Sequence, residues 1–91
     1  MALAFLFKPA SLSATQYDEC IRRLSAAGAG APAGRLHHAC FGTGDKMQVL
    51  ELWDSPASFD KFGATLVPIL AELGIDPGQP EVAEVHNVIP G

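Results

Sequence analysis

The sequence predicts an α+β fold of the ferredoxin-like type, with elements in the order β-α-β-β-α-β and a single antiparallel sheet. Three observations lead to this prediction: an apolar strand-like start, a hairpin placed between two capped helices, and a last strand-like segment after a turn-rich stretch. The 91 residues are enough for one domain, residues 1–91, built around one hydrophobic core.

The first strand is expected from Ala2 to Lys8, because both alternating sets of positions are apolar, as in a strand covered on two faces. Pro9 ends this strand. Ser13 can then cap a helix, since Gln16 follows three residues later and completes a capping box. Apolar residues recur at helical spacing from there until Gly28, which ends the first helix.

Two strand-like segments follow, Arg35 to Gly42 and Lys46 to Trp53, and the turn residues between them indicate a β-hairpin. Ser55 caps a second helix with Pro56 in its first turn, where the missing amide hydrogen costs nothing. Pro68 falls within the apolar stripe of this helix. We therefore expect it to kink the helix or divide it into two pieces.

The last strand is expected from Glu81 to Ile89, after the turn-rich residues 76–80. In the ferredoxin-like arrangement both helices lie on one face of the sheet, whereas the first strand is apolar on both sides. A second copy of the chain is the simplest cover for the other face. We therefore expect a homodimer in which the two sheets pack against each other.

Composition excludes several classes of partner. Ten acidic residues outnumber six basic ones, and no basic cluster exists beyond Arg22 and Arg23, so the charge pattern of nucleic-acid binding is missing. An acidic chain is repelled by anionic lipid, and the longest apolar run, Met1 to Phe7, is far too short to span a bilayer. Cys20 and Cys40 show neither disulfide nor zinc spacing, which favours free thiols and a cytoplasmic protein.

The hairpin register predicts which side chains face one another. For a loop of two or four residues, His38 lies opposite Glu51. A three-residue loop would change the partners but would keep Glu51 and Trp53 on one face. Under the first register, one face carries Leu36, His38, Cys40, Val49, Glu51 and Trp53. The reverse face carries His37, Ala39, Phe41, Leu50 and Leu52, a set apolar enough to pack against the helices.

Glu51 is the most informative residue, because a carboxylate in the middle of a central strand is costly unless a partner or water satisfies it. Paired with His38, it could hold a proton-transfer group near neutral pH, which makes the two residues catalytic candidates. The alternative is a structural histidine–glutamate bond that fixes the hairpin or meets the partner subunit. Trp53 could line a cavity or belong to the core.

The remaining candidates are substrate-contacting residues. Leu36, Cys40 and Val49 share the face of Glu51, whereas His86 and Asn87 point to opposite faces of the last strand, so at most one of these two reaches a cavity. The three histidines show no metal-ligand spacing, and no dinucleotide or phosphate-binding motif is present. We therefore expect neither a metal nor a cofactor.

The segment from Val49 to Ala57, VLELWDSPA, resembles the dimeric α/β-barrel superfamily, in particular its antibiotic biosynthesis monooxygenase-like members. These often carry a Glu-x-Trp-x-Ser run, here Glu51, Trp53 and Ser55, between the third strand and the second helix. The resemblance implies two ferredoxin-like chains pairing as a dimeric α/β barrel. Many members have a histidine nine residues after the tryptophan. This chain has Phe62 there, which weakens the case for haem ligation or for any mechanism that needs that histidine.

The resemblance implies a cofactor-free monooxygenase-like enzyme that acts on a small aromatic or polyketide-type molecule in a cavity between the sheet and the dimer partner. An isomerase or cyclase would use the same proton chemistry without oxygen. A non-catalytic protein that binds small ligands and a purely structural dimerisation module are the other hypotheses. The sequence does not separate them, because a fold of this kind supports many functions.

Overall fold

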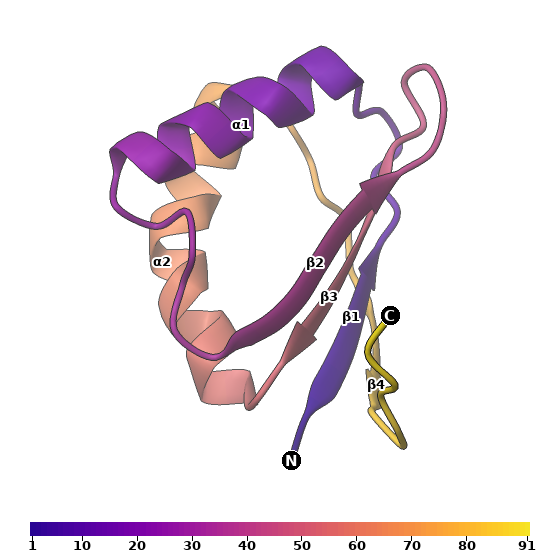
Figure 1. Ribbon diagram of the computed structural model, residues 1–91. Helices are drawn as coiled ribbons and strands as arrows, with labels where there is room; N and C mark the ends of the chain where they lie inside the picture. The colour runs from indigo at the N-terminus through magenta and orange to yellow at the C-terminus, as the bar shows by residue number, and fades with distance from the viewer.

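The computed structural model describes all 91 residues and confirms the expected fold. The four strands form one sheet in the order β2-β3-β1-β4, and every neighbouring pair is antiparallel. Both helices lie on one side of this sheet (Figure 1). The elements are β1 (Leu3–Phe7), α1 (Ala14–Ala26), β2 (Arg35–Phe41), β3 (Gln48–Trp53), α2 (Pro56–Glu72) and β4 (Glu81–Glu84).

Local sequence signals fix the helix boundaries. The Ser13 hydroxyl accepts a hydrogen bond from the Gln16 amide at 3.1 Å, and the Gln16 side chain accepts one from the Ser13 amide at 2.9 Å. The predicted capping box is therefore present. Helix α2 begins at Pro56 after the capping residue Ser55, and Gly74 follows its end in a left-handed conformation with φ of 67°.

Helix α2 is not divided at Pro68, although the sequence predicts a kink or a division there. The helix continues through this residue to Glu72. Pro68 and Ala64, one turn earlier, are both exposed. Water can therefore satisfy the Ala64 carbonyl group, which has lost its helical amide partner, so the helix loses one internal hydrogen bond without ending.

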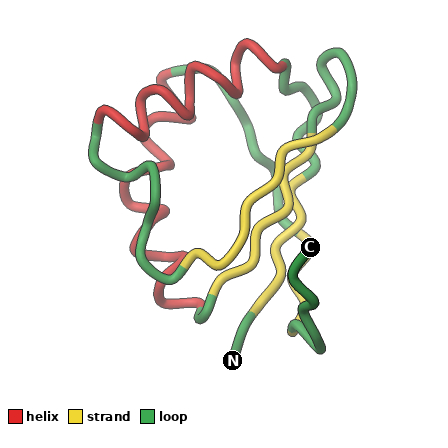
Figure 2. Tube along the Cα trace, in the orientation of Figure 1, coloured by secondary structure: helices red, strands yellow, loops and turns green.

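Strand β4 ends at Glu84, five residues earlier than expected. Its only neighbour in the sheet is β1, whose first residue Leu3 pairs with Glu84. One further backbone bond joins the Val85 amide to the Ala2 carbonyl at 3.0 Å, after which no strand remains to pair with. The residues after β4 continue as a loop to the C-terminus (Figure 2).

The helices cover the face of the sheet that carries the large aromatic side chains. The rings of Phe5 and Phe59 stack with 4.2 Å between their centroids, and those of Trp53 and Phe62 lie 5.4 Å apart. Cys20 and Leu24 of α1 complete the buried core with Phe5, Trp53 and Phe62. The predicted face assignment is therefore wrong, because the aromatic rings offer the helices more apolar surface than Leu50, Leu52 and their neighbours do.

The opposite face of the sheet is open in one chain. Residues paired in antiparallel strands share a face, so alternation places Ala4, Leu6 and their partners on the side away from the helices. The residues of this open face on the three inner strands are Ala4, Leu6, His37, Ala39, Phe41, Gln48, Leu50 and Leu52.

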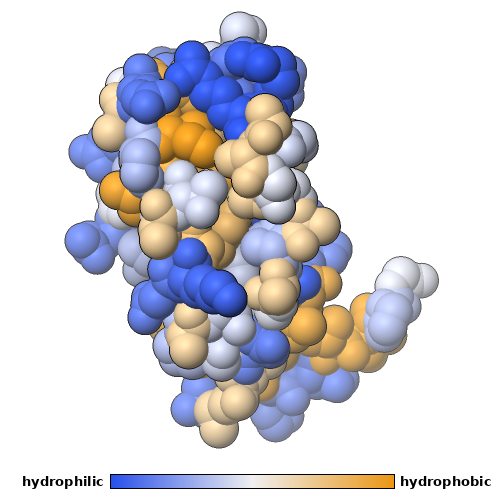
Figure 3. All heavy atoms as spheres, turned by 90° about the vertical axis from the view of Figure 1, so that its left-hand side faces the viewer, coloured by the Kyte–Doolittle hydropathy of each residue, from blue (hydrophilic) through white to orange (hydrophobic).

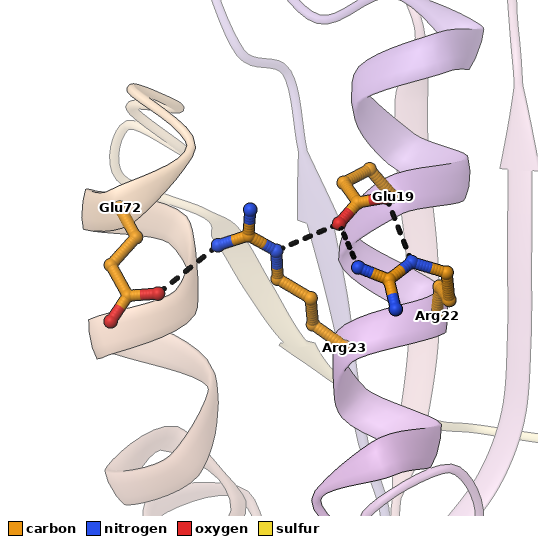
Figure 4. A network of polar contacts seen from close by, with 4 residues as sticks. All are labelled: Glu19, Arg22, Arg23 and Glu72. Atoms are coloured by element: carbon orange, nitrogen blue, oxygen red, sulfur yellow. Dashed lines mark hydrogen bonds and ion pairs between the residues drawn. The ribbon is translucent and has the colours of Figure 1, made fainter.

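The two helices are also joined by an ionic network on their outer surface. Glu19 of α1 binds Arg22 and Arg23 of the same helix, and Arg23 reaches Glu72 of α2 at 3.1 Å (Figure 4). Hydrogen bonds from the two arginines lower the pKa of Glu19 to about 2. Because Arg22 and Glu72, the outer partners, are about two-thirds exposed, the network adds little to stability.

Candidate functional site

A cavity of about 400 Å³ lies between the sheet and the two helices. Of its 19 lining residues, 13 are hydrophobic, and they come from both helices and from the sheet. Hydrophobic surface framed by hydrophilic residues is visible on the helix side of the molecule (Figure 3). The volume suits a small organic ligand, and the few polar side chains that reach the cavity include Tyr17, His38 and Glu51.

Glu51 is only 4% exposed, and both of its carboxylate oxygens have partners. The Trp53 indole Nε1 donates to Oε1 at 3.2 Å, and His38 Nδ1 lies 2.6 Å from Oε2. The nearest guanidinium nitrogen of Arg35 is 3.8 Å from Oε2. These contacts explain how a carboxylate can lie beneath the helices, since an unpartnered one would be far too costly there.

His38 connects Glu51 to Tyr17 of helix α1. The Tyr17 hydroxyl lies 2.5 Å from His38 Nε2, and the two rings stack with 5.8 Å between their centroids. As a carboxylate, Glu51 accepts the hydrogen of Nδ1, which leaves the lone pair on Nε2 free to accept the Tyr17 hydroxyl hydrogen. The three side chains thus form a directed chain of hydrogen bonds that ends in the cavity.

The surroundings of Tyr17 determine its protonation state. Burial, followed by the nearby Cys40 thiol, raises the pKa of Tyr17 from its ordinary value of 10.0 to about 12. At neutral pH the phenol therefore keeps its proton and acts as a donor toward His38. His38 Nε2 accepts this hydrogen bond through its lone pair, and the lone pair can take up a proton once the Tyr17 hydroxyl turns away, which makes His38 the candidate base.

The predicted site residues divide into two groups. The pairing of His38 with Glu51 and of Cys40 with Val49 is as predicted. His38, Val49 and Glu51 line the cavity, whereas Trp53 and Cys40 do not. Trp53 has no exposed surface and supports the site from the core through its bond to Glu51.

Three further predicted ligand contacts, besides Trp53 and Cys40, lie outside the cavity. A β-bulge shifts the register between Arg35 and His37, so Arg35 pairs with Trp53 in place of Leu36. Leu36 is consequently 58% exposed and faces no cavity. His86 and Asn87 lie beyond the end of β4 and are exposed, because no neighbouring strand holds them in the sheet.

The cavity itself also differs from the prediction. The sequence predicts a cavity between the sheet and a partner subunit, with Glu51 on the face away from the helices. It lies within one chain, because the face that carries His38 and Glu51 is the one that α1 and α2 cover. No group of three His, Cys, Asp or Glu side chains is arranged to hold a metal ion.

Sequence reasoning missed two members of the site, Tyr17 and Arg35. Tyr17 recurs with the apolar residues of α1 at helical spacing, a pattern that predicts packing of its ring but gives no role to its hydroxyl. The residue type itself indicated such a role, because a tyrosine on the inner face of a helix needs a hydrogen-bond partner. Arg35 gave no such signal, since only the bulge brings it opposite Trp53, near Glu51 and over the Phe62 ring at 5.8 Å.

Cys20 and Cys40 are free thiols, and burial raises the pKa of both, so neither is an activated nucleophile.

Neither helix has the length and apolar composition required to cross a membrane.

No protein-family model and no curated protein matches the chain, but solved structures do. An antibiotic biosynthesis monooxygenase-like protein from Chloroflexus aurantiacus J-10-fl superposes with a TM-score of 0.70 at 18% identity, covering 99% of this chain and 98% of that one. A point mutant of SnoaB, a cofactor-independent oxygenase from Streptomyces nogalater, gives 0.66 at 16% identity, with 99% and 98% covered. A further monooxygenase-like protein, from Caulobacter crescentus CB15, gives 0.65 at 17% identity, with 97% and 91% covered.

Proposed function

We propose that this chain, which has the fold of the antibiotic biosynthesis monooxygenase-like proteins, is a cofactor-free oxygenase of small phenolic or enolic molecules of the aromatic or polyketide type. The observation that carries the proposal is the hydrogen-bonded chain Tyr17–His38–Glu51, which opens into an apolar cavity of about 400 Å³. Such a cavity favours an apolar ring system, and the imidazole favours a ligand with an acidic hydrogen.

In the proposed reaction His38 is the base. Glu51 holds the imidazole through Nδ1 and stabilises the imidazolium that forms when Nε2 takes up a proton. Tyr17 moves its hydroxyl from Nε2 to the oxygen of the substrate, where a phenol of raised pKa remains a hydrogen-bond donor. The apolar walls offer water few hydrogen-bond partners, which limits reprotonation of the substrate anion before it reacts with oxygen.

In the proposed reaction dioxygen is the only co-substrate, and it accounts for all the oxygen atoms and electrons involved. Removal of a proton from an activated methylene gives a carbanion, which transfers electrons to dioxygen and forms a carbon–oxygen bond. Return of the proton from His38 gives a hydroperoxide, and loss of water from it gives a carbonyl group. The methylene carbon is oxidised, one oxygen atom remains in the product, and the other leaves as water.

The functional unit in this proposal is a cytoplasmic homodimer formed through the open face of the sheet. That face carries Leu6, Leu50 and Leu52 at half-buried positions, and Phe41 is 45% exposed. The loop after β4 adds Val88 and Ile89, which are 53% and 82% exposed. A second copy would bury this apolar surface.

Oxygen uptake by the chelator-treated protein tests the proposed function. The substrate is a hydroxylated tricyclic compound with a methylene between two aromatic rings, and the matched variants are Glu51→Gln and Glu81→Gln. Glu51→Gln should lower the rate by about 10²-fold or more, because the amide cannot stabilise an imidazolium. Glu81 is an exposed partner of Lys8, so its variant should keep the wild-type rate.

Other results would point to other functions. Product formation without oxygen uptake would support an isomerase or cyclase. Binding of the compound without any turnover would support a non-catalytic ligand-binding protein. An unchanged rate in Glu51→Gln would remove Glu51 and its hydrogen-bonded chain from the mechanism.

A further inference from the structure

Helix α2 turns one face toward the cavity, and the residue at the centre of that face has no side chain. The lining residues of α2 recur at helical spacing, and all but two carry a large apolar side chain. The exceptions are Asp60 and, one turn later, Gly63. The lining residues of this helix are Phe59, Asp60, Phe62, Gly63, Leu66, Val67 and Leu70.

The usual structural reasons for a glycine do not apply to Gly63. A glycine within a helix is destabilising relative to alanine, so it needs a compensating role. Its φ is not positive, in contrast to that of six other glycines. A Cβ atom added at Gly63 would meet no atom within 4 Å, whereas one added at Gly34 would overlap Ser58 and Asp54. Close packing therefore does not require a glycine at this position.

The aromatic side chains beside Gly63 are held in place. Phe59 stacks on Phe5, while Phe62 packs against Trp53 and lies under the Arg35 guanidinium. Since these contacts fix both rings against the sheet, neither ring is free to turn into the space next to Gly63 without losing them. The absence of a side chain at Gly63 therefore enlarges the cavity between rigid walls.

We propose that Gly63 is a specificity-determining position, which lets a planar apolar ring system lie directly against the backbone of α2. This inference rests on the proposed function in that it takes the cavity to be the ligand site. A side chain at position 63 would occupy the space of a ring. The chain would then accept only narrower ligands.

Probe binding tests the inference without any turnover. The probe is N-phenyl-1-naphthylamine, a neutral compound whose fluorescence rises in apolar surroundings. In Gly63→Leu the new side chain would occupy on the order of 100 Å³, a substantial part of the cavity. We expect the dissociation constant to rise about tenfold or more. The control is Ala64→Leu, at the next residue of the helix, which is exposed and does not line the cavity, and its dissociation constant should stay within about twofold of wild type.

Gly63→Ala provides a second readout if the leucine variant does not fold. It should raise the Tm by a few degrees, because alanine is the better helix former and its methyl group meets no neighbour. It should also weaken binding of a three-ring probe, anthracene, more than that of a two-ring probe, naphthalene. Equal weakening, or unchanged binding in a folded Gly63→Leu, would overturn the inference.

These results separate the two proposals. A wild-type protein that binds none of the probes would refute the cavity as a ligand site and so remove the basis of both. A wild-type protein and a Gly63→Leu variant that bind equally well would refute only the role of Gly63. Loss of turnover in Glu51→Gln with intact probe binding leaves the inference about Gly63 unaffected.

Discussion

The two faces of the sheet are built from alternate residues of the same strands, yet they differ in chemistry. The covered face holds the buried carboxylate of Glu51, with His38 and Trp53 as partners for its two oxygens. The open face carries mostly aliphatic side chains, such as Leu6 and Leu50, which are half-buried in one chain. The buried charge therefore indicates the side of the candidate site, and the mostly aliphatic surface indicates the side on which we expect a partner.

Replacing Trp53 by alanine should give the largest effect on the covered face. Trp53 has no exposed surface and contacts Phe62 and the Glu51 carboxylate, so its loss leaves a cavity and an unpartnered oxygen. The free energy of unfolding should fall by about 3–5 kcal/mol, a large part of the stability of a small domain. Unfolding in urea measures this loss of free energy. The matched variant on the open face, Leu52→Ala, should cost far less, and equal costs would contradict the difference between the faces.

Replacing Leu50 by aspartate tests the open face. Leu50 pairs with Leu6 on one side and Ala39 on the other, so it lies at the centre of that face. A carboxylate there would be buried without a partner in a dimer but would remain in water in a monomer. Sedimentation should show at least a tenfold weaker dimer, with helix content unchanged by circular dichroism. A dimer of wild-type strength would show that the subunits meet elsewhere.

Tyr17 should give a smaller, pH-dependent effect. Its pKa is about 12 in the folded protein against 10.0 ordinarily, so folding favours the protonated phenol. The resulting stability is fully present below pH 10 and is lost as the pH rises toward 12. The loss should be on the order of 1 kcal/mol, since the phenol is only partly buried.

The near-ultraviolet absorbance of the phenolate measures this ionisation directly, because Tyr17 is the only tyrosine. Its midpoint should fall to about 10 in urea, the ordinary value for tyrosine. Tyr17→Phe should lack the tyrosine-dependent loss of stability above pH 10. A folded-state midpoint near 10 would mean that the hydroxyl is exposed and not bonded to His38.

Features that depend on residues close in sequence were predicted correctly, whereas features that depend on packing between distant segments were not. Capping at Ser13 and the pairing of His38 with Glu51 depend on neighbours in sequence or across one hairpin, and both are confirmed. Which face the helices cover depends on packing between distant segments, such as Phe5 on Phe59. Alternation alone cannot decide this, since both faces of β1 are apolar.

The residues of the candidate site divide in the same way into those predictable from local sequence and those placed by long-range packing. Glu51 was recognisable because a charge in a central strand demands a partner. Tyr17 reaches His38 only through the packing of α1 on the sheet, and Arg35 reaches Glu51 only through the bulge at Leu36. The early end of β4, which leaves His86 outside the sheet, follows from the length of its neighbour β1.

The central claim is that Glu51 and Tyr17 hold His38 with a hydrogen on Nδ1 and an unprotonated Nε2 that accepts the Tyr17 hydroxyl hydrogen. Nitrogen-15 NMR of the His38 ring, recorded above neutral pH, measures this most directly. The account predicts a protonated, hydrogen-bonded Nδ1 and an unprotonated Nε2, with the preference weakened in Glu51→Gln. A hydrogen on Nε2, or rapid exchange between the two forms in the wild-type protein, would contradict it.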